Sequence, residues 1–339
     1  MTRRQALLLP AAVLLQAEEP RNLSYPLRVI EGSITPADMF FIRDHFAEPD
    51  VSLEDWTLKI EGQVEHPFEL NFSDLLESAS TKIEAVLECA GNKASGSAAS
   101  NGTWEGVPLK ALLETAHPKS DAKFVLLEAA DSGKLFPDTP PAPYVQLLPI
   151  QKCTDPLSLV AYKLNDRLLA KGNGFPARAL FPGWYAMDSV KWLRRIVMLS
   201  AGELSPFTES GMNRLYNRGS VRLTEIQVKS AVAWPPNDQK LPAGKHTVWG
   251  FAWTGEGQIR TVSVTMDGGN NWSAATLDTN PGPYRWVRWS FTWAAAPGEY
   301  VLMSRAVDSS GSEQPLERDP KRKDGYELNW CLPVRCRVV

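Results

Sequence analysis

The segment Val86-Leu-Glu-Cys-Ala-Gly-Asn-Lys93 decides how the rest of this chain is interpreted. The run Lys82 to Cys89 predicts a strand that breaks at Ala90, which puts Cys89 at a strand end, at the mouth of a loop. A thiol followed by small residues, which let the backbone approach closely, suits a soft thiolate ligand of a bulky metal complex. A lone cysteine in a strand is also commonly a small buried hydrophobic group. On its own, this segment leaves both interpretations open.

On both sides of this segment, predicted strands alternate with short predicted helices. Strands are expected at 56–62, 82–89, 123–129 and 190–199, and helices from Phe72, with Ser73 as N-cap, and at 108–116. At 339 residues the chain is long enough for two domains. The mixed pattern predicts an α+β protein whose first domain, residues 27–203, is of mixed α/β structure.

From Val221 onward the pattern contains short alternating strands and no helical stretch. The strands are predicted at 225–228, 244–253, 259–266, 285–293 and 300–307. The turn Asp267-Gly-Gly-Asn-Asn271 between two of them is typical of a hairpin. This recurrence predicts an all-β sandwich over 221–339, joined to the first domain by a linker at 204–220.

Composition and spacing exclude several classes of function. The formal net charge is −3 with no block of like charges, so no nucleic-acid partner is expected. No apolar run in the mature chain is long enough to span a membrane. Spacings typical of zinc sites and of c-type haem are missing, as are phosphate-loop, dinucleotide and Gly-x-Ser-x-Gly motifs. A hydrolase stays formally possible, but no residue is nominated as its nucleophile.

The first nineteen residues have the features of an export signal. Arg3 and Arg4 precede an apolar stretch that ends at Leu15, and the small residue Ala17 stands before two acidic residues. The arginine pair favours the twin-arginine route, which carries proteins already folded around a cofactor. A Sec signal or a single N-terminal helix is the alternative. We therefore expect residues 1–19 to direct the protein to the periplasm.

An exported protein with four cysteines invites a disulfide interpretation. Cys331 and Cys336 lie in what looks like a terminal strand, where five residues span roughly 16 Å and place the two side chains on opposite faces. A disulfide needs Cα atoms within about 7 Å. The pair is therefore not expected to bond unless Pro333 breaks the strand.

Several motifs, in order and spacing, resemble the sulfite oxidase family. Phe40-Phe-Ile-Arg-Asp-His45, Cys89-Ala-Gly-Asn92, Trp104-Glu-Gly-Val-Pro-Leu109, Asn173-Gly-Phe-Pro-Ala-Arg178, Pro182-Gly183 and Val190-Lys-Trp-Leu193 resemble its molybdopterin domain. Gly250-Phe-Ala-Trp253 and Val264-Thr-Met-Asp-Gly-Gly-Asn-Asn-Trp272 resemble its C-terminal immunoglobulin-like dimerisation domain. The resemblance implies a mixed α/β molybdopterin domain followed by an immunoglobulin-like sandwich, and a homodimer.

The resemblance also implies one molybdenum–molybdopterin per chain, with Cys89 as the metal ligand. Arg43 is expected to face an oxyanion or the metal's oxygens, and Lys93 to add positive potential. Further implied cofactor contacts are Arg178 and Lys191 to the pterin phosphate, and His45, Asp131, Asn173 and Ser189 to the pterin. Tyr216 is the favoured tyrosine facing the metal and Tyr185 the alternative, with Arg214, Arg218 and Arg222 near Tyr216. Trp104 is expected to pack rather than to form a pocket wall.

The chain departs from the family pattern around the expected substrate pocket. Lys93-Ala94 stands where a second arginine is common, and Asn173 replaces a histidine. The segment from Lys93 to Thr103 is built mostly of Ala, Ser and Gly, so an aromatic gate is not expected there. The C-terminal arginine near the substrate has no clear counterpart, and Lys321, Arg322 or Lys323 are the candidates for its place.

The resemblance favours a periplasmic enzyme that oxidises sulfite to sulfate by oxo transfer at molybdenum. No haem or flavin is expected in the chain, so electrons are expected to pass to a separate acceptor such as a c-type cytochrome. Two alternatives stay open. One is a molybdopterin oxidoreductase acting on a sulfoxide, another sulfur compound or nitrate, and the other is a non-catalytic binding module.

Overall fold

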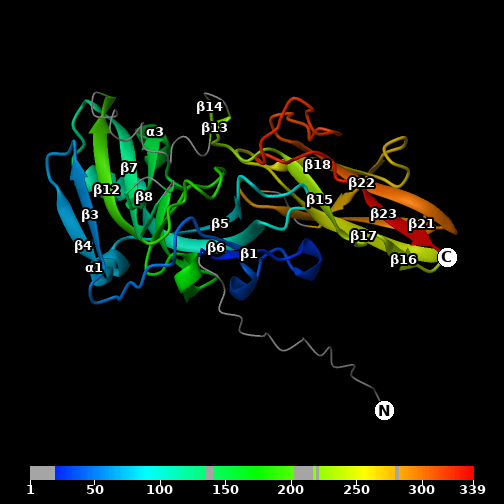
Figure 1. The fold of residues 1–339 in the computed structure, drawn as a ribbon, viewed down its shortest axis with the longest axis horizontal. Helices are drawn as coiled ribbons and strands as arrows, with labels where there is room; N and C mark the ends of the chain where they lie inside the picture. Colours follow the sequence, from blue (N-terminus) through cyan, green and yellow to red (C-terminus); the bar gives the residue numbers. More distant parts are fainter. Residues whose placement is uncertain (1–19, 135–136, 138–139, 202–216, 219–220, 279–281) are drawn as a thin grey trace, which may run out of the picture.

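The computed structural model describes residues 20–134, 137, 140–201, 217–218, 221–278 and 282–339. Two β-rich parts lie side by side along the long axis of the molecule (Figure 1). We call residues 20–200 the N-terminal part and residues 221–339 the C-terminal part. Among the described residues, every helix is too short or too polar to cross a membrane.

Two five-stranded sheets form the N-terminal part. One has the order β4-β3-β12-β7-β8 and the other β10-β9-β6-β5, with β11 paired to β9. The strands of the first sheet are β3 (Thr57–Gly62), β4 (Phe68–Asn71), β7 (Ala122–Gly133), β8 (Ala142–Pro149) and β12 (Leu193–Ser200). Those of the second are β5 (Thr81–Glu88), β6 (Ala99–Pro108), β9 (Leu159–Leu164), β10 (Arg167–Leu168) and β11 (Arg178–Leu180). β1 (Asn22–Leu23) and β2 (Ile42–Arg43) pair with each other in a separate two-stranded sheet.

Strands predominate over helices in this part, so the expectation of a mixed α/β domain is right only in part. The α-helices are α1 (Phe72–Glu77), α2 (Leu109–Thr115) and α3 (Ile150–Cys153). The 3₁₀ turns are η1 (Leu27–Val29), η2 (Ala37–Met39) and η3 (Lys171–Asn173). All are too short to be stable alone, and they are held by packing against the sheets.

The predicted N-cap of the first helix is wrong by two residues. Asn71, not Ser73, caps α1: its side chain accepts a hydrogen bond from the Asp74 N–H at 3.0 Å. The Asp74 carboxylate in turn accepts from the Asn71 N–H at 2.9 Å. This reciprocal capping box satisfies two amide N–H groups at once, which Ser73 inside the helix could not do.

The main core lies in the N-terminal part and follows the predicted periodicity. Leu58 and Ile60 of β3 are fully buried, and β3 pairs in parallel with β12, which places Ile60 beside Ile196. The buried faces of α1 and α2 add Leu75 and Leu113 to the same cluster. Burying each such side chain contributes about 1.5–3 kcal/mol, so this core is the main stabilising element.

The C-terminal part consists of two facing sheets. One has the order β15-β17-β21-β20 and the other β16-β23-β22-β18-β19. Their strands are β15 (Lys229–Trp234), β16 (Gln239–Leu241), β17 (Gly244–Trp253), β18 (Ile259–Thr265), β19 (Ser273–Ala274), β20 (Thr276–Leu277), β21 (Val287–Ala295), β22 (Gly298–Asp308) and β23 (Val334–Val338). The short β13 (Asn217–Arg218) and β14 (Val221–Arg222) pair with each other. Val248, Val262 and Leu302 meet in a core between the sheets.

One predicted strand does not form. Residues 225–228 alternate between exposed and buried, yet only Glu225 makes an isolated bridge, to Trp184, and β15 begins at Lys229. Ile226 instead packs in a third cluster that joins the two parts of the molecule. The alternation of apolar and polar residues at 225–228 therefore reflects an extended segment with one buried side, which does not pair within a sheet.

The third cluster forms the junction between the two parts. Trp253 and Phe251 of β17 pack there with Val86 of β5 and with Ala90 and Ala99 from the two ends of the loop after Cys89. Gly96 in this loop has φ +80°, and a Cβ atom there would lie 2.9 Å from the Trp253 ring. The small residues of the loop therefore serve close packing against the C-terminal part. Figure 1 shows β5 and β6 running along this junction.

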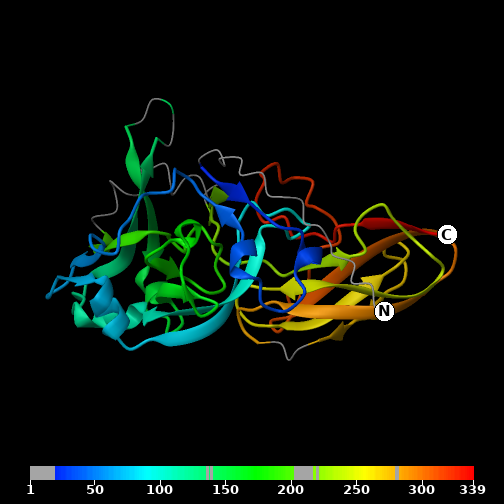
Figure 2. The same cartoon turned by 90° about the horizontal axis from the view of Figure 1, so that it is seen from below.

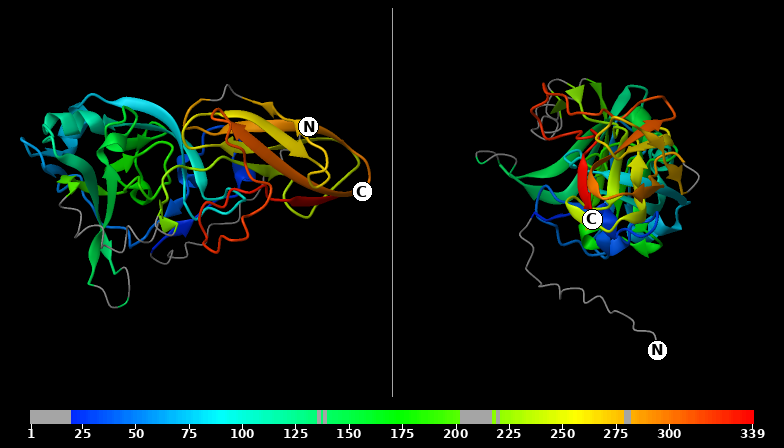
Figure 3. Two further views of the ribbon diagram at one scale, coloured as in Figure 1. Left: turned by 90° about the horizontal axis from the view of Figure 1, so that it is seen from above. Right: turned by 90° about the vertical axis from the view of Figure 1, so that its right-hand side faces the viewer.

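Two features of the outer shape stand out: a projecting hairpin and the position of the C-terminus. The β7–β8 hairpin projects from the side of the N-terminal part (Figure 2, and Figure 3, left). The C-terminus lies at the end of the molecule furthest from the N-terminal part.

The four cysteines are unpaired, as predicted for Cys331 and Cys336. β23 begins after Pro333 and contains only Cys336, so the expectation that both cysteines lie in one terminal strand is wrong for Cys331. Both thiols are nevertheless free.

Candidate active site

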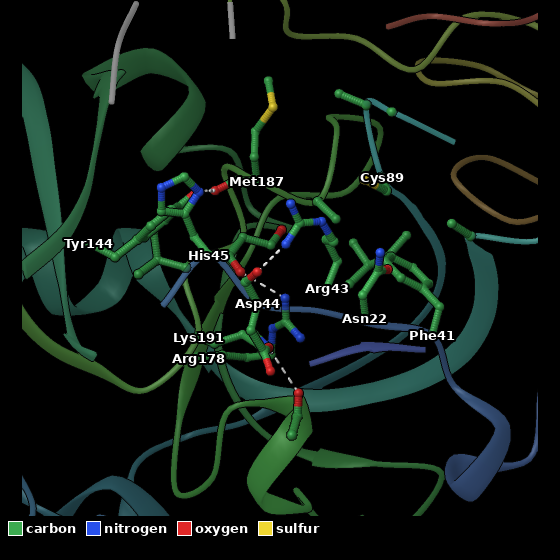
Figure 4. Close-up of a pocket in the computed structure, with 18 of the residues that line it drawn as sticks. Asn22, Phe41, Arg43, Asp44, His45, Cys89, Tyr144, Arg178, Met187 and Lys191 are labelled. Atoms are coloured by element: carbon green, nitrogen blue, oxygen red, sulfur yellow. Dashed lines mark hydrogen bonds and ion pairs between the residues drawn. The ribbon is translucent and has the colours of Figure 1, made fainter. Parts of the chain in front are cut away.

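A cavity of about 440 Å³ opens where β2, the end of β5 and the β11–β12 connection meet. That volume is typical of pockets that take a small-molecule ligand or cofactor. The side chains of Arg43, Cys89, Arg178 and Lys191 converge on it (Figure 4). Further lining residues are Asn22, Phe41, Asp44, His45, Gly91, Asp131, Tyr144, Gly172, Met187, Ser189, Trp192 and Tyr326.

Cys89 lies immediately after β5, as the broken strand pattern predicted. Its N–H donates to the Ala98 carbonyl at 3.0 Å, and its carbonyl accepts from the Asn92 N–H at 2.8 Å, which closes a tight loop. Burial raises the pKa of the Cys89 thiol, while the N–H of Gly91 and the charge of Arg43 act in the opposite direction. The thiol therefore needs a strong cationic partner, such as a metal ion, to become a stable thiolate.

Glu88 is the buried anchor of this loop. It is 1% exposed, and its carboxylate accepts hydrogen bonds from Asn92 at 2.9 Å and from the Trp253 indole at 2.7 Å. It also pairs with the ammonium of Lys229, which is equally buried. Two of these partners come from the C-terminal part. The position of the Cys89 loop therefore depends on contacts between the two parts of the chain.

Two cations, the buried Arg178 and the partly buried Lys191, form the floor of the cavity. The guanidinium of Arg178 donates to the carbonyls of Ser189 at 2.7 Å and Asn173 at 3.1 Å, and it stacks over the Trp104 ring at 5.3 Å. Burial lowers its pKa to about 9, with the Asp44 charge opposing, so Arg178 stays cationic at neutral pH. Trp104 is fully buried and supports Arg178 from outside the lining, as expected.

Lys191 is the second cation, and Asp44 is its partner. The Lys191 ammonium pairs with one Asp44 oxygen and donates to the Gly172 carbonyl at 3.0 Å. Burial lowers the pKa of Lys191, and the Asp44 charge raises it. The other Asp44 oxygen is buried with no hydrogen-bond partner among the described residues. Because such an oxygen is costly to bury alone, it is suited to accept a hydrogen bond from a ligand in the cavity.

Two further titratable groups face the same space. Asp131 of β7 is 4% exposed, and burial raises its pKa to about 7 against the charge of Lys191. His45 packs edge-on to Phe46, and burial followed by the Arg43 charge lowers the pKa of its imidazole. His45 is therefore held neutral. Arg43 itself is exposed at the cavity and donates to the Asp44 carbonyl.

Most of the residues proposed from the sequence lie together here. Arg43, His45, Cys89, Asp131, Arg178, Ser189 and Lys191 all line the cavity. Asn173 is buried behind the lining, where its carbonyl holds Arg178. The Lys93 side chain is exposed and does not line the cavity. Its backbone carbonyl accepts a hydrogen bond from the Lys229 ammonium at 3.5 Å.

The tyrosine prediction has a mixed outcome. Tyr216 and Arg214 lie outside the described residues, and only the backbone of Arg218 is described. The alternative, Tyr185, is 2% exposed and packs in the junction cluster, so it does not reach the cavity. Arg222 pairs with the buried Asp188 and with Gln146 instead of lining the cavity.

The C-terminal basic residues have different environments. Arg322 is engaged by Asp324 at 2.7 Å, by Glu327 at 2.9 Å and by the Tyr326 carbonyl at 2.9 Å. Lys321 and Lys323 are exposed, and none of the three lines the cavity. The arginine clamp instead places Tyr326 at the cavity, 3.9 Å from the Cβ position of Gly91. The next residue, Glu327, donates its N–H to the Ala90 carbonyl at 2.9 Å.

Sequence reasoning missed Asp44, Tyr144, Met187 and Tyr326 as lining residues. Asp44 stands between Arg43 and His45 in the sequence. Because both neighbours were proposed as site residues, this position could have identified Asp44 as a third. Tyr144 donates its hydroxyl to the Met187 carbonyl at 2.9 Å, which links β8 to the β11–β12 connection. Tyr326 comes from the C-terminal part, and no spacing in the sequence connects it to Cys89.

Two family profiles cover most of the chain. Residues 45–207 match the oxidoreductase molybdopterin binding domain, and residues 220–321 match the Mo-co oxidoreductase dimerisation domain. The chain belongs to the sulfite oxidase family of molybdopterin oxidoreductases. Members of this family are enzymes, and the molybdopterin domain implies a molybdenum cofactor.

Relatives within the sulfite oxidase family differ in what they act on. The chain is 28% identical to sulfite oxidase of Gallus gallus, over 89% of this chain and 72% of that protein. It is 27% identical to the NADH nitrate reductase of Solanum lycopersicum, over 89% of this chain but only 38% of that protein. The sulfane dehydrogenase SoxCD of Paracoccus pantotrophus has a similar structure, with a TM-score of 0.83, 28% identity, and coverage of 95% of this chain and 86% of that one.

The residues of the cavity fit the cofactor of the sulfite oxidase family. A soft thiol, the buried Arg178 and the partly buried Lys191 line a space of about 440 Å³. Asp44, beside Lys191, has one buried carboxylate oxygen without a hydrogen-bond partner among the described residues. Cys89 would ligate the metal, and Arg178 and Lys191 would neutralise the pterin phosphate, which needs cations once partly buried. Asp44 and Asp131 would accept or donate hydrogen bonds to the pterin.

The raised pKa of Asp131 predicts a measurable pH dependence in the cofactor-free protein. The pKa of Asp131 is about 7 in the folded protein and about 3.8 in the unfolded chain, so the ionised carboxyl destabilises the fold, and this loss of stability develops as pH rises from 3.8 to 7. Asp131→Asn should therefore match wild type near pH 4 and exceed its unfolding free energy by up to about 4 kcal/mol at pH 8. Chemical denaturation of both proteins across this range measures the difference. Equal pH profiles would show that Asp131 ionises normally.

Proposed function

We propose that this protein oxidises sulfite to sulfate by oxygen-atom transfer at a molybdenum cofactor and passes the electrons to a separate acceptor. The observation that carries the proposal is that a permanently charged guanidinium, Arg43, and the Cys89 thiol line one cavity whose floor is also cationic. A dianionic oxyanion is attracted to such a site, since buried or partly buried positive charges are weakly screened.

When bound, the molybdenum cofactor supplies oxygen-atom transfer and takes up two electrons. The residues of this chain hold and orient it. Cys89 would supply the protein sulfur, on a loop fixed by Glu88 and Asn92. Arg178 and Lys191 would bind the pterin phosphate, and Asp44 keeps Lys191 in place through their ion pair.

Substrate binding falls to Arg43 at the cavity and to residues close to it. Arg43 offers a fork of donors that matches two oxygens of an oxyanion. Tyr326, placed by the Arg322 clamp, forms the wall beside Gly91 and limits the width of the space next to Cys89. Tyr216 stays the proposed tyrosine of the metal site. Lys93, with its exposed side chain, is no longer favoured as a substrate contact.

Restoring oxygen from water releases protons, so a nearby acceptor is needed. Asp131 is suited to this task because its pKa of about 7 lets it hold a proton or release one near neutral pH. His45, held neutral, can accept a hydrogen bond through one ring nitrogen and donate one through the other. Both groups can therefore also contact the pterin without adding positive charge.

The broader organisation is proposed from the sequence. Residues 1–19 serve as a twin-arginine export signal to the periplasm, 27–203 as the catalytic domain and 204–220 as a linker. Residues 221–339 form an immunoglobulin-like domain that pairs two chains. A c-type cytochrome is the proposed electron acceptor. The match of residues 220–321 to a dimerisation domain supports the pairing.

The experiment that tests the function is a substrate comparison on molybdenum-loaded protein. We expect sulfite-dependent reduction of ferricyanide, with a kcat/KM for sulfite at least roughly 100-fold above that for any other reduced sulfur compound tested as electron donor. Reduction of a sulfoxide by a viologen dye is expected to be negligible. Reduction of nitrate by a viologen dye is expected to be negligible. Molybdenum without sulfite oxidation would keep the family and reject this substrate. Efficient nitrate reduction would instead favour the alternative of a molybdopterin oxidoreductase that acts on nitrate.

A further inference from the structure

We propose that Glu65, His66 and His117 form a surface site for a divalent transition-metal cation, with Zn²⁺ as the best match. One ligand atom from each side chain lies within 4.8 Å of the others. The two imidazole rings are 4.8 Å apart between centroids and inclined at 71°. All three residues are exposed, and none lines the cavity that contains Cys89. The site is thus separate from the one proposed for molybdenum.

Two segments distant in sequence are fixed together before any ion binds. The Glu65 N–H donates to the His117 carbonyl at 2.9 Å, and the His66 N–H donates to the Ala116 carbonyl at 3.0 Å. A bridge between Val64 and Pro118 continues this pairing. The turn between β3 and β4 is therefore attached to the segment after α2 by backbone hydrogen bonds, and Val64 and Ala116 of these segments pack in the same core cluster. Because the ligands are already held close, binding requires little further ordering.

The backbone of His117 is the second unusual feature. Its φ is +55°, just past the end of α2, at a helix-terminal position that glycine or asparagine usually occupies. Its N–H donates to the Glu114 carbonyl at 3.1 Å, which fixes the turn. A histidine adopts this conformation at a cost that glycine avoids. The result is an imidazole that lies against His66, as two ligands of one ion would.

The ligand set selects the class of ion. Two imidazoles and one carboxylate are ligands of Zn²⁺, and three protein ligands leave one tetrahedral position for water. Calcium and magnesium ions prefer all-oxygen sites, so the imidazole pair disfavours them. Exposure of all three side chains gives the ion direct access from solvent. Bound there, it would join the β3–β4 turn to the end of α2 and stabilise the edge of the main core.

The test uses cofactor-loaded protein without a histidine tag, so that Cys89 is engaged and no added imidazoles compete. Titration calorimetry with Zn²⁺ is expected to show one site per chain from this cluster. His66→Gln and His117→Asn should each weaken binding at least tenfold, and asparagine is chosen because it accepts the left-handed backbone. A Zn²⁺ concentration that saturates wild type should raise its Tm by roughly 5–10 °C and should raise the Tm of each variant by clearly less.

Three controls make the result decisive. His246→Gln removes a histidine of the C-terminal part and should leave the affinity for Zn²⁺ unchanged. The Tm of each variant without metal should match wild type, which shows that the fold is intact. Co²⁺ should bind without a sulfur-to-cobalt charge-transfer band. No binding by wild type, wild-type affinity in both cluster variants, or a thiolate band would each overturn the proposal.

Discussion

Cys89→Ser is expected to lower turnover of the substrate by more than about 100-fold, beyond what loss of a residue that only supports a ligand usually costs. A serine hydroxyl is a harder ligand than a thiol and is far less readily ionised, so it replaces a thiolate poorly on a soft metal complex. Burial already raises the pKa of the Cys89 thiol, so the fold supplies a thiolate only when the metal is bound. The measurements are molybdenum per chain, thiolate-to-metal absorption and steady-state turnover.

Cys153→Ala is the matched control for this experiment. It removes another buried thiol from the N-terminal part, from the main core and away from the cavity. Activity per bound molybdenum should stay within about twofold of wild type, even if stability falls by the amount expected for a small cavity. Full activity in Cys89→Ser, at equal molybdenum content, would remove Cys89 from the metal site.

Lys229→Met is expected to cost about 3–5 kcal/mol of unfolding free energy, the largest stability effect anticipated for this chain. Lys229 and Glu88 are each 1% exposed and pair across the junction between the two parts. Methionine fills the volume but leaves the Glu88 carboxylate buried with only the neutral donors Asn92 and Trp253. Because Glu88 directly precedes Cys89, we also expect faster loss of molybdenum. Denaturation and metal release during dialysis measure the two effects.

Two comparison variants show whether the stability lost in Lys229→Met comes from the buried ion pair. Glu88→Gln combined with Lys229→Met removes both charges and should recover most of the lost stability. Together with Glu88→Gln alone, the double variant gives a coupling energy for the pair. Lys82→Met breaks an exposed ion pair with Asp166 and should change stability by less than about 1 kcal/mol. If Lys229→Met costs no more than Lys82→Met, the buried pair does not anchor the Cys89 loop.

Local sequence patterns predicted a strand correctly where the segment is both buried on at least one side and hydrogen-bonded to a neighbouring strand. The segments around Leu58 and Val248 both form strands as predicted; β3 has one buried face, whereas β17 is buried on both faces from Gly250 to Trp253. At residues 225–228 the same alternation describes a chain that packs without pairing. The N-cap of α1 was misassigned because Asn71 and Ser73 both favour caps, and only the reciprocal bond with Asp74 distinguishes them.

Site residues were predictable where they lie in recognisable motifs and not elsewhere. Cys89, Arg178 and Lys191 each lie in a motif whose order along the chain is informative, and all three line the cavity. Lys93 lies in the same loop as Cys89 but points to solvent. Tyr326 reaches the cavity from the C-terminal part through the Arg322 clamp. A contact of that kind depends on how the two parts pack together.

The sequence by itself determined the family, the position of Cys89 at the end of a strand and the β-rich character of the C-terminal part, because motif order and residue periodicity are local properties of the chain. The tertiary structure alone decided that Glu88 meets Lys229, that Asp131 has a pKa of about 7, and that His66 lies against His117. The physical reason is that burial, charge pairing and ligand geometry depend on which distant side chains meet. Those encounters are set by packing of the whole chain.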